Sequence, residues 1–250
     1  MTSRDGTSIA YERAGSGPAV ILVGGGLDDG AENAPLAAEL ASRFAVFNYT
    51  RRGRGGSGDT APYSVAREVE DLEALIAVAG GPAHVLGVSS GGALALEAAA
   101  AGLPIDRLAV YDVPSDMPGD WPAYRERLHE LLEEDRRGEA LELFMRLAGS
   151  SEDGIARARE SHLWPGLERL AHTLAYDAAC LGDGRTPVDR LATIDRPTLV
   201  MTGGAGEVFD RAADAIAASV PHAERLVLEG QGHVADPRAL AGALERFFGA

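Results

Sequence analysis

The sequence predicts an α/β fold in which helices cover both faces of a mostly parallel central sheet. Short apolar runs rich in β-branched residues alternate along the chain with longer segments of helical period. One block, residues 115–187, interrupts this alternation with helical segments and no convincing strand. We therefore expect an α/β core of residues 1–114 and 188–250, with a helical cap of residues 115–187 inserted between two of its strands.

Continuous apolar runs of this kind are typical of strands buried on both faces of a parallel sheet. The predicted strands, in chain order, are Ser8–Glu12, Ala19–Val23, Ala45–Tyr49, His84–Val88, Leu108–Val113, Pro197–Met201 and Arg225–Leu228. The predicted core helices are Val65–Ala79, Gly91–Ala101, Arg211–Ser219 and Pro237–Phe248, and those of the cap are Pro122–Arg137, Glu139–Ala148 and Leu167–Leu181. Asp236 and Pro237 are a typical N-cap and first residue of a helix.

Composition narrows the classes of partner. With 38 acidic and 23 basic residues the chain carries a formal charge of −15, which repels phosphate backbones and anionic lipid surfaces. The single cysteine, Cys180, allows neither an internal disulfide nor a cysteine metal cluster. Residues 1–17 hold no apolar signal core, and no run of about 18 apolar residues occurs. We expect a cytoplasmic protein with a small-molecule substrate, no cofactor or metal, no nucleic acid partner and no membrane association.

Residues 87–91, Gly-Val-Ser-Ser-Gly, match the pattern G-x-S-x-G. The stretch HVLGV before the serine is strand-like, and GALALEAAAAG after it is strongly helical. A sharp turn between a strand and a helix lifts the serine hydroxyl clear of the sheet, and glycines leave room for the close approach of the two elements. The sequence thus predicts Ser89 as a nucleophile; the simpler alternative is a Gly/Ser turn with Ser89 as a helix cap.

A serine hydroxyl needs a base that takes its proton, so one of six histidines must serve. His233 lies on a glycine-rich loop between the last predicted strand and the last helix, at the carboxyl end of the sheet, where open α/β sheets place their sites. The other histidines are better explained as surface or core residues: His84, His129, His162, His172 and His222. We therefore predict His233 as the base.

Four motifs in this order resemble those of the α/β-hydrolase fold superfamily, and the resemblance extends over nearly the full chain. They are GPAVILVGGG, RRGRGGSGD, GVSSGG and GQGHVADP. The resemblance implies a serine, acid, histidine triad in chain order and a helical cap over the site. This sequence departs from the family pattern at two positions. Gly24 stands where the family usually has a histidine before the oxyanion glycine, and Val88 stands before the nucleophile, where the family often has a histidine.

Backbone N–H groups are the expected donors of the oxyanion hole, because fixed donors need no reorganisation during the reaction. Ser90 supplies one by following the nucleophile, and alignment with the family makes Gly26 the second, with Gly25 as the alternative register. A phosphate-binding interpretation of the glycine run lacks both the Walker lysine and the dinucleotide spacing. The arginines of residues 51–58 are expected to have a structural role.

The acid is less easily placed. In the commonest family pattern it follows the strand Pro197–Met201, but Gly206 occupies that position, with Glu207 one residue later and Asp210 expected as a helix cap. The alternative place is the end of the strand after the nucleophile helix, where Asp112 follows Ser89 by 23 residues (112 − 89), an acid placement similar to that of haloalkane dehalogenases. We predict Asp112, with Glu207 as the alternative acid.

A serine rather than an aspartate at the elbow argues against dehalogenation and epoxide opening and favours acyl transfer. The resulting hypothesis is a serine-dependent hydrolase of a small or medium, fairly apolar ester or lactone; thioesters and carbon–carbon bonds next to carbonyls are hydrolysed on similar scaffolds. Five aromatic residues are candidates for the pocket wall, although most are expected to pack the cap: Trp121, Tyr124, Phe144, Trp164 and Tyr176. The alternative function is non-hydrolytic binding or rearrangement of a small molecule on the same fold.

Overall fold

The computed structural model describes residues 1–116, 119–204 and 206–249. Within them, seven strands form one sheet in the order β1-β3-β2-β4-β5-β6-β7, in which only β1 is antiparallel to its neighbour. The strands are β1 Tyr11–Ala14, β2 Ala19–Val23, β3 Ala45–Tyr49, β4 Ala83–Val88, β5 Ile105–Tyr111, β6 Thr198–Thr202 and β7 Ala223–Val227. The predicted α/β class with a mostly parallel sheet is confirmed.

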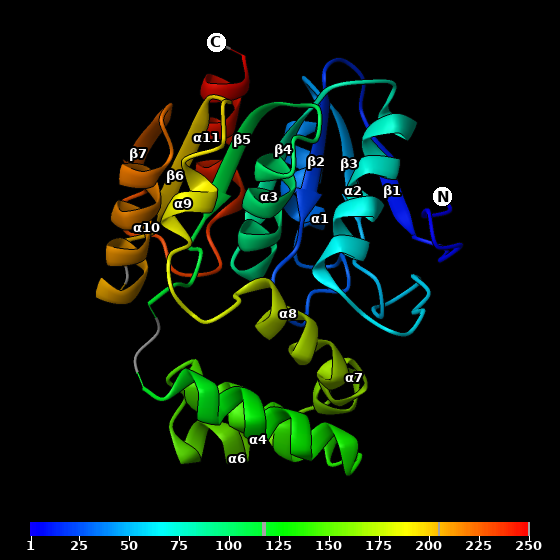
Figure 1. Ribbon diagram of the computed structural model, residues 1–250, viewed down its shortest axis with the longest axis vertical. Helices are drawn as coiled ribbons and strands as arrows, with labels where there is room; N and C mark the ends of the chain where they lie inside the picture. The colour runs from blue at the N-terminus through cyan, green and yellow to red at the C-terminus, as the bar shows by residue number, and fades with distance from the viewer. Residues whose placement is uncertain (117–118, 205, 250) are drawn as a thin grey trace.

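Helices cover both faces of this sheet (Figure 1). Alternate residues of β2 show why: Ile21 and Val23 belong to the core beneath one set of helices, whereas Val20 and Leu22 belong to the core beneath the other. The first face is covered by α2 Val65–Ala79, α3 Ser90–Ala100, α9 Val188–Leu191 and α10 Glu207–Ser219, and the second by α1 Ala34–Leu40 and α11 Pro237–Phe248. The sheet therefore has two apolar cores, as continuous apolar strands require.

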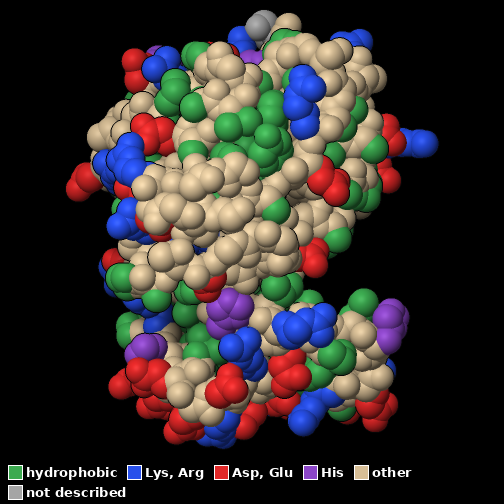
Figure 2. Space-filling view, turned by 90° about the vertical axis from the view of Figure 1, so that its right-hand side faces the viewer, with side chains coloured by type: hydrophobic (Ala, Val, Ile, Leu, Met, Phe, Trp, Pro, Cys, Tyr) green, Lys and Arg blue, Asp and Glu red, His purple; other side chains and the backbone are tan. Residues whose placement is uncertain are grey.

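A further helical layer lies beyond one end of the sheet, between β5 and α9 in the chain (Figure 1). It consists of α4 Trp121–Glu133, α5 Arg137–Leu147, α6 Glu152–Arg159, α7 Trp164–Leu170, a 3₁₀ turn at Ala171–Thr173 and α8 Leu174–Cys180. This layer has a core of its own, built on Trp121, Leu128, Leu141 and Trp164. Figure 2 shows the surface hollowed between this layer and the main body. Its assignment as a separate cap domain stays a prediction.

Several predicted boundaries were wrong for identifiable reasons. The first strand begins at Tyr11 rather than Ser8. It is an exposed edge strand, so its sequence has no apolar run that would mark where it begins and ends. The strand predicted as Leu108–Val113 ends at Tyr111, because Asp112 has a φ of +47°, which no strand accommodates. The segment predicted as one helix, Leu167–Leu181, is divided into α7, the 3₁₀ turn and α8.

The helix predicted from Arg211 begins at Glu207, with Gly206 as its N-cap residue. Asp210 therefore lies in the first turn and does not cap the helix; its Oδ1 accepts hydrogen bonds from Thr202 Oγ1 and Arg225 Nη2. The short helices α1, α6 and α9 were not predicted. No helix among the described residues is both long and apolar enough to cross a bilayer.

Candidate active site

The turn between β4 and α3 holds Ser89 in a strained conformation. Ser89 has φ +54° and ψ −127°, a region that costs a residue with a Cβ about 1–3 kcal/mol. Its N–H donates to Tyr111 O at 2.9 Å, which ties the turn to β5. A Cβ on Gly87 would lie 2.6 Å from Gly92 Cα, and one on Gly91 would lie 2.5 Å from Val23 O. The two glycines of the motif are thus required by the close packing of β4, α3 and β2.

His233 lies on the loop between β7 and α11, where the sequence placed it. Its Nδ1 is 3.1 Å from Asp112 Oδ2, and its ring stacks on Phe209 at 4.8 Å between centroids. Tyr111 fixes the same loop by donating from its hydroxyl to Gly232 O at 2.5 Å. The histidine side chain is 43% exposed, whereas that of Asp112 is 3% exposed, so the pair has one buried and one accessible end.

Asp112 directly follows β5 and, like Ser89, has a positive φ, which turns its side chain away from the strand direction. Its Oδ1 accepts a hydrogen bond from Gly203 N at 3.3 Å, just beyond β6. Glu207, the alternative acid, is the first residue of α10. The carboxylate that contacts the histidine is therefore the one at the end of β5, held between the backbone of the next strand and the imidazole.

The two halves of the predicted oxyanion hole also meet here. Gly25 packs against the predicted nucleophile, since a Cβ on it would lie 3.0 Å from Ser89 Cβ. Gly26 and Ser90 both line a cavity of about 360 Å³ together with Ser89 and His233. The rest of the wall is mostly apolar, and it includes Val88, Pro114, Trp121, Phe144, Leu147, Leu181, Phe209 and Val234.

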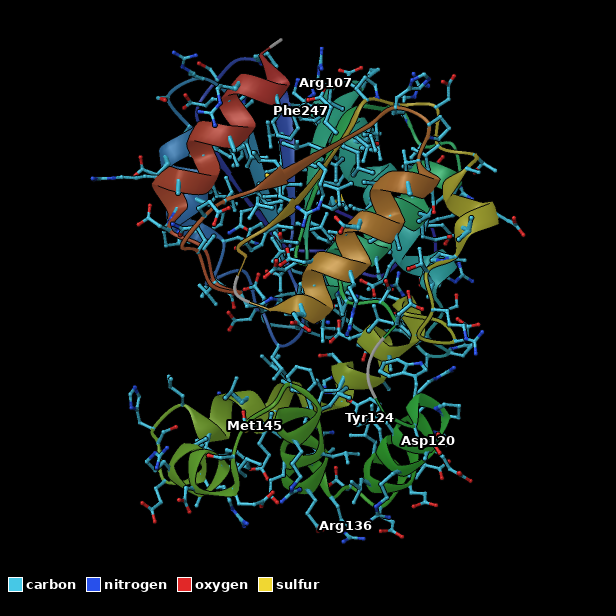
Figure 3. All side chains as sticks on the ribbon, turned by 90° about the vertical axis from the view of Figure 1, so that its left-hand side faces the viewer. Arg107, Asp120, Tyr124, Arg136, Met145 and Phe247 are labelled. Atoms are coloured by element: carbon cyan, nitrogen blue, oxygen red, sulfur yellow. The ribbon has the colours of Figure 1, made fainter. Side chains whose placement is uncertain are left out.

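Of the five aromatic candidates for the pocket, Trp121 and Phe144 lie in this wall. Trp164 instead packs in the core of the helical layer, and Tyr176 stacks on Tyr63 at 3.8 Å between ring centroids. Tyr124 packs on Trp121 at 5.2 Å. Figure 3 shows Tyr124 and Met145 in the helical layer, with Arg107 and Phe247 at the opposite end of the molecule.

Gly24 stands where the family usually has a histidine, and the structure gives a steric reason for a glycine there that the sequence did not reveal. A Cβ on Gly24 would overlap Asp28 Oδ2. Asp28 organises the loop after β2, because its Oδ1 accepts from Gly30 N at 2.8 Å and from Glu32 N at 3.1 Å, and its Oδ2 accepts from Asn33 Nδ2 at 3.1 Å. Burial raises the pKa of Asp28.

The arginines after β3 are fully buried and paired, which their loop position alone did not predict. Arg51 binds both carboxylate oxygens of Glu68, at 2.8 and 2.7 Å, and donates to Asp177 Oδ1 at 2.8 Å. Arg54 donates to the same Asp177 oxygen at 2.7 Å and to Gly25 O in the loop after β2. A buried guanidinium needs a buried partner. Three arginines close together after a buried strand could therefore have indicated that buried carboxylates pair with them. In the structure, Glu68 and Asp177 are two such partners.

Comparison with known proteins decides the family. The model of a family described as "Alpha/beta hydrolase family" matches residues 19–243. The chain belongs to this family. It is 35% identical to the pimeloyl-[acyl-carrier protein] methyl ester esterase of Xanthomonas campestris pv. campestris, over 94% of this chain and 97% of that protein. Members of this class are hydrolases, so the predicted fold and enzyme class are confirmed.

Solved structures show the same architecture. The α/β hydrolase from Sphaerobacter thermophilus has a TM-score of 0.93 and 50% sequence identity, with 99% of each chain covered. A hydrolase from Pseudomonas aeruginosa has a TM-score of 0.80 and 28% identity, covering all of this chain and 97% of its own. The α/β hydrolase described here thus has the fold of these enzymes over its whole length. Among the described residues, no three His, Cys, Asp or Glu side chains lie close enough to hold a metal ion.

Proposed function

We propose that this α/β hydrolase cleaves a small or medium, fairly apolar carboxylic ester or lactone through an acyl-enzyme on Ser89. The observation that carries the proposal is the Asp112–His233 hydrogen bond beside a strained serine in a mostly apolar cavity. A carboxylate on Nδ1 holds the tautomer in which Nε2 is free to accept a proton. The methyl ester in the name of the Xanthomonas campestris relative supports the bond type.

In this mechanism Ser89 Oγ attacks the ester carbonyl while His233 Nε2 takes the hydroxyl proton. The backbone N–H groups of Ser90 and Gly26 stabilise the negative charge that develops on the carbonyl oxygen. The imidazolium, steadied by Asp112, then protonates the leaving alcohol. Water, deprotonated by the same imidazole, attacks the acyl-enzyme and releases the acid. Residues 115–187 act as the cap that shapes the pocket for this small-molecule substrate.

A fluorophosphonate probe tests the proposal, since only an activated serine reacts with it. We expect stoichiometric labelling of the wild-type protein, none in Ser89→Ala, and unchanged labelling in the control Ser64→Ala, which alters an exposed serine before α2. A folded wild-type protein that is not labelled would favour the non-hydrolytic alternative. A series of p-nitrophenyl esters of increasing chain length, compared with lactones, then identifies the preferred substrate class.

A further inference from the structure

Asp177 connects the helical layer to the nucleophile turn. It lies on α8, and its side chain is 8% exposed. Its Oδ1 accepts three hydrogen bonds: from Arg51 Nη1 at 2.8 Å, from Arg54 Nη2 at 2.7 Å and from Ser90 Oγ at 2.7 Å. These donors occupy one carboxylate oxygen and fix the orientation of the other.

The second oxygen, Oδ2, is buried and has no hydrogen-bond partner among the described residues. Asp177 lines the cavity with Ser89 and Ser90, and a Cβ built on Gly26 would lie 3.3 Å from Oδ2. Oδ2 is therefore buried in the wall of the cavity, next to Gly26, on the side where the proposed oxyanion hole lies. A buried polar atom without a partner costs free energy unless a ligand or water satisfies it.

Asp177 remains a carboxylate. Burial by itself would raise its pKa, but the positive charges of Arg54 and Arg51 outweigh that effect and hold the pKa below its usual value. An ionised carboxylate has no proton to donate, so Oδ2 can only accept a hydrogen bond. The two guanidinium groups also offset its charge, which limits repulsion of the oxyanion formed nearby.

We propose that Asp177 is a specificity-determining residue, whose Oδ2 accepts a hydrogen bond from a hydroxyl or N–H group of the substrate. Because Oδ2 lies beside Gly26, this donor belongs on a carbon next to the reacting carbonyl or one position further along. A carboxylate at the same place of the substrate is disfavoured, since two carboxylates would then lie side by side in a buried site and Oδ2 would receive no hydrogen bond. This inference rests on the proposed hydrolysis of esters by Ser89.

The test compares kcat/KM for ethyl butanoate, its 2-hydroxy and 3-hydroxy derivatives, and monoethyl succinate. A hydrogen bond to a charged group predicts that wild-type enzyme prefers one hydroxy ester over ethyl butanoate by roughly 10- to 100-fold. In Asp177→Asn the carbonyl oxygen still accepts from the arginines and Ser90, whereas the amide group replaces Oδ2 with a donor. We expect this variant to lose the preference for the hydroxy ester and to have a higher kcat/KM than the wild type for monoethyl succinate.

Asp183→Asn is the matched control, because it removes an exposed aspartate just after α8; its preference should equal that of the wild type. The ratio of kcat/KM between two substrates would not move if Asp177 were only structural, since a distorted site slows both. A wild-type enzyme that hydrolyses ethyl butanoate as fast as both hydroxy esters overturns the inference and leaves ester hydrolysis standing. That comparison uses only wild-type enzyme, so it tests the inference even if Asp177→Asn fails to fold.

If wild-type enzyme hydrolyses none of these esters, the proposed function fails and binding decides the inference separately. Calorimetry on the Ser89→Ala protein, with the hydroxy esters and ethyl butanoate as ligands, measures the hydrogen bond without turnover. Tighter binding of a hydroxy ester by roughly tenfold or more supports the role of Asp177. Equal affinities overturn it.

Discussion

At the scale of single residues, the Asp112–His233 pair makes the sharpest prediction about activity. Asp112→Asn keeps the shape of the side chain but removes the charge that steadies the imidazolium and the acceptor that selects its tautomer. In the serine-protease template this change costs about 10⁴ in kcat, or roughly 5 to 6 kcal/mol of barrier. We expect a loss of that order in single-turnover acylation, measured on protein whose folding has been checked by circular dichroism.

Glu207→Gln is the matched control, because Glu207 was the alternative acid and begins α10. An exposed or partly exposed carboxylate outside the reaction should cost little in rate and within about 0.5 kcal/mol in stability. A large loss in Glu207→Gln with a small one in Asp112→Asn would reverse the assignment. Near-normal rates in both variants would mean that another group orients His233.

Protonation of His233 predicts the acid side of the pH profile. A protonated imidazole cannot take the serine proton, so kcat/KM for an activated ester should fall towards acid pH. At the acid extreme the decline should approach about tenfold per pH unit. Initial rates between pH 5 and 8 provide the measurement. The same acid limb in the residual activity of His233→Ala would contradict the role of His233.

At the scale of elements, close packing of α3 against β2 explains Gly91, the second glycine of the G-x-S-x-G motif. An alanine Cβ at position 91 would lie 2.5 Å from Val23 O and against Gly24 O, and backbone atoms cannot move aside as a side chain can. Overpacking of this kind typically costs about 1–3 kcal/mol. We therefore expect Gly91→Ala to lower the free energy of unfolding by at least that amount, as measured by urea denaturation.

For Gly242→Ala, in another helix, we expect the opposite effect on the free energy of unfolding. A Cβ there would lie 3.7 Å from Arg246 Nη1, an ordinary contact in α11. Alanine is the better helix former, so this variant should gain about 0.5–1 kcal/mol. If the two substitutions changed the free energy of unfolding equally, helix propensity rather than the contact with β2 would determine the effect of an alanine at position 91.

At the scale of the whole molecule, a buried charge network joins β3, α2 and α8. Arg51 is 1% exposed and binds Glu68 through two hydrogen bonds. Burial alone would raise the pKa of Glu68, but Arg51 outweighs it and lowers the pKa below the usual value. The unfolded chain therefore binds more protons than the folded one as pH falls, so this stabilisation is present above about pH 4.5 and is lost below it.

Glu68→Gln leaves Arg51 with one buried charge partner fewer, and breaking a buried pair costs about 3–5 kcal/mol. We expect a lower free energy of unfolding at neutral pH and a flatter pH dependence between about pH 5 and 3. Glu139→Gln is the control, because Glu139 also binds an arginine through two hydrogen bonds but lies on the surface. An effect of Glu68→Gln no larger than that of the control would show that the network contributes little to stability.

Much of the core fold was predictable from the sequence because its signals are local. The limits of β2, β3, α2 and α11 were predicted to the residue, since a buried strand reads as a continuous apolar run and an amphipathic helix repeats every three to four residues. Short or exposed elements were missed: α1 has only seven residues, and α6 buries only Ile155, so neither has a clear helical period. The elbow at Ser89 was predictable because its motif and the strand and helix on either side of it are contiguous in the sequence.

Only the tertiary structure decided what contacts what across the chain. Asp112 is 121 residues from His233, and the sequence left Glu207 open as the alternative acid; the backbone turn after β5 and the contact with Gly203 direct the carboxylate of Asp112 to the imidazole. Asp177 is 126 residues from Arg51, and its role depends on which of its two oxygens the arginines occupy. The sequence by itself determined the elements and the motifs they carry, because those follow from residue type and spacing. The pairing of buried charges and the position of Asp177 Oδ2 beside Gly26 are set by packing in three dimensions.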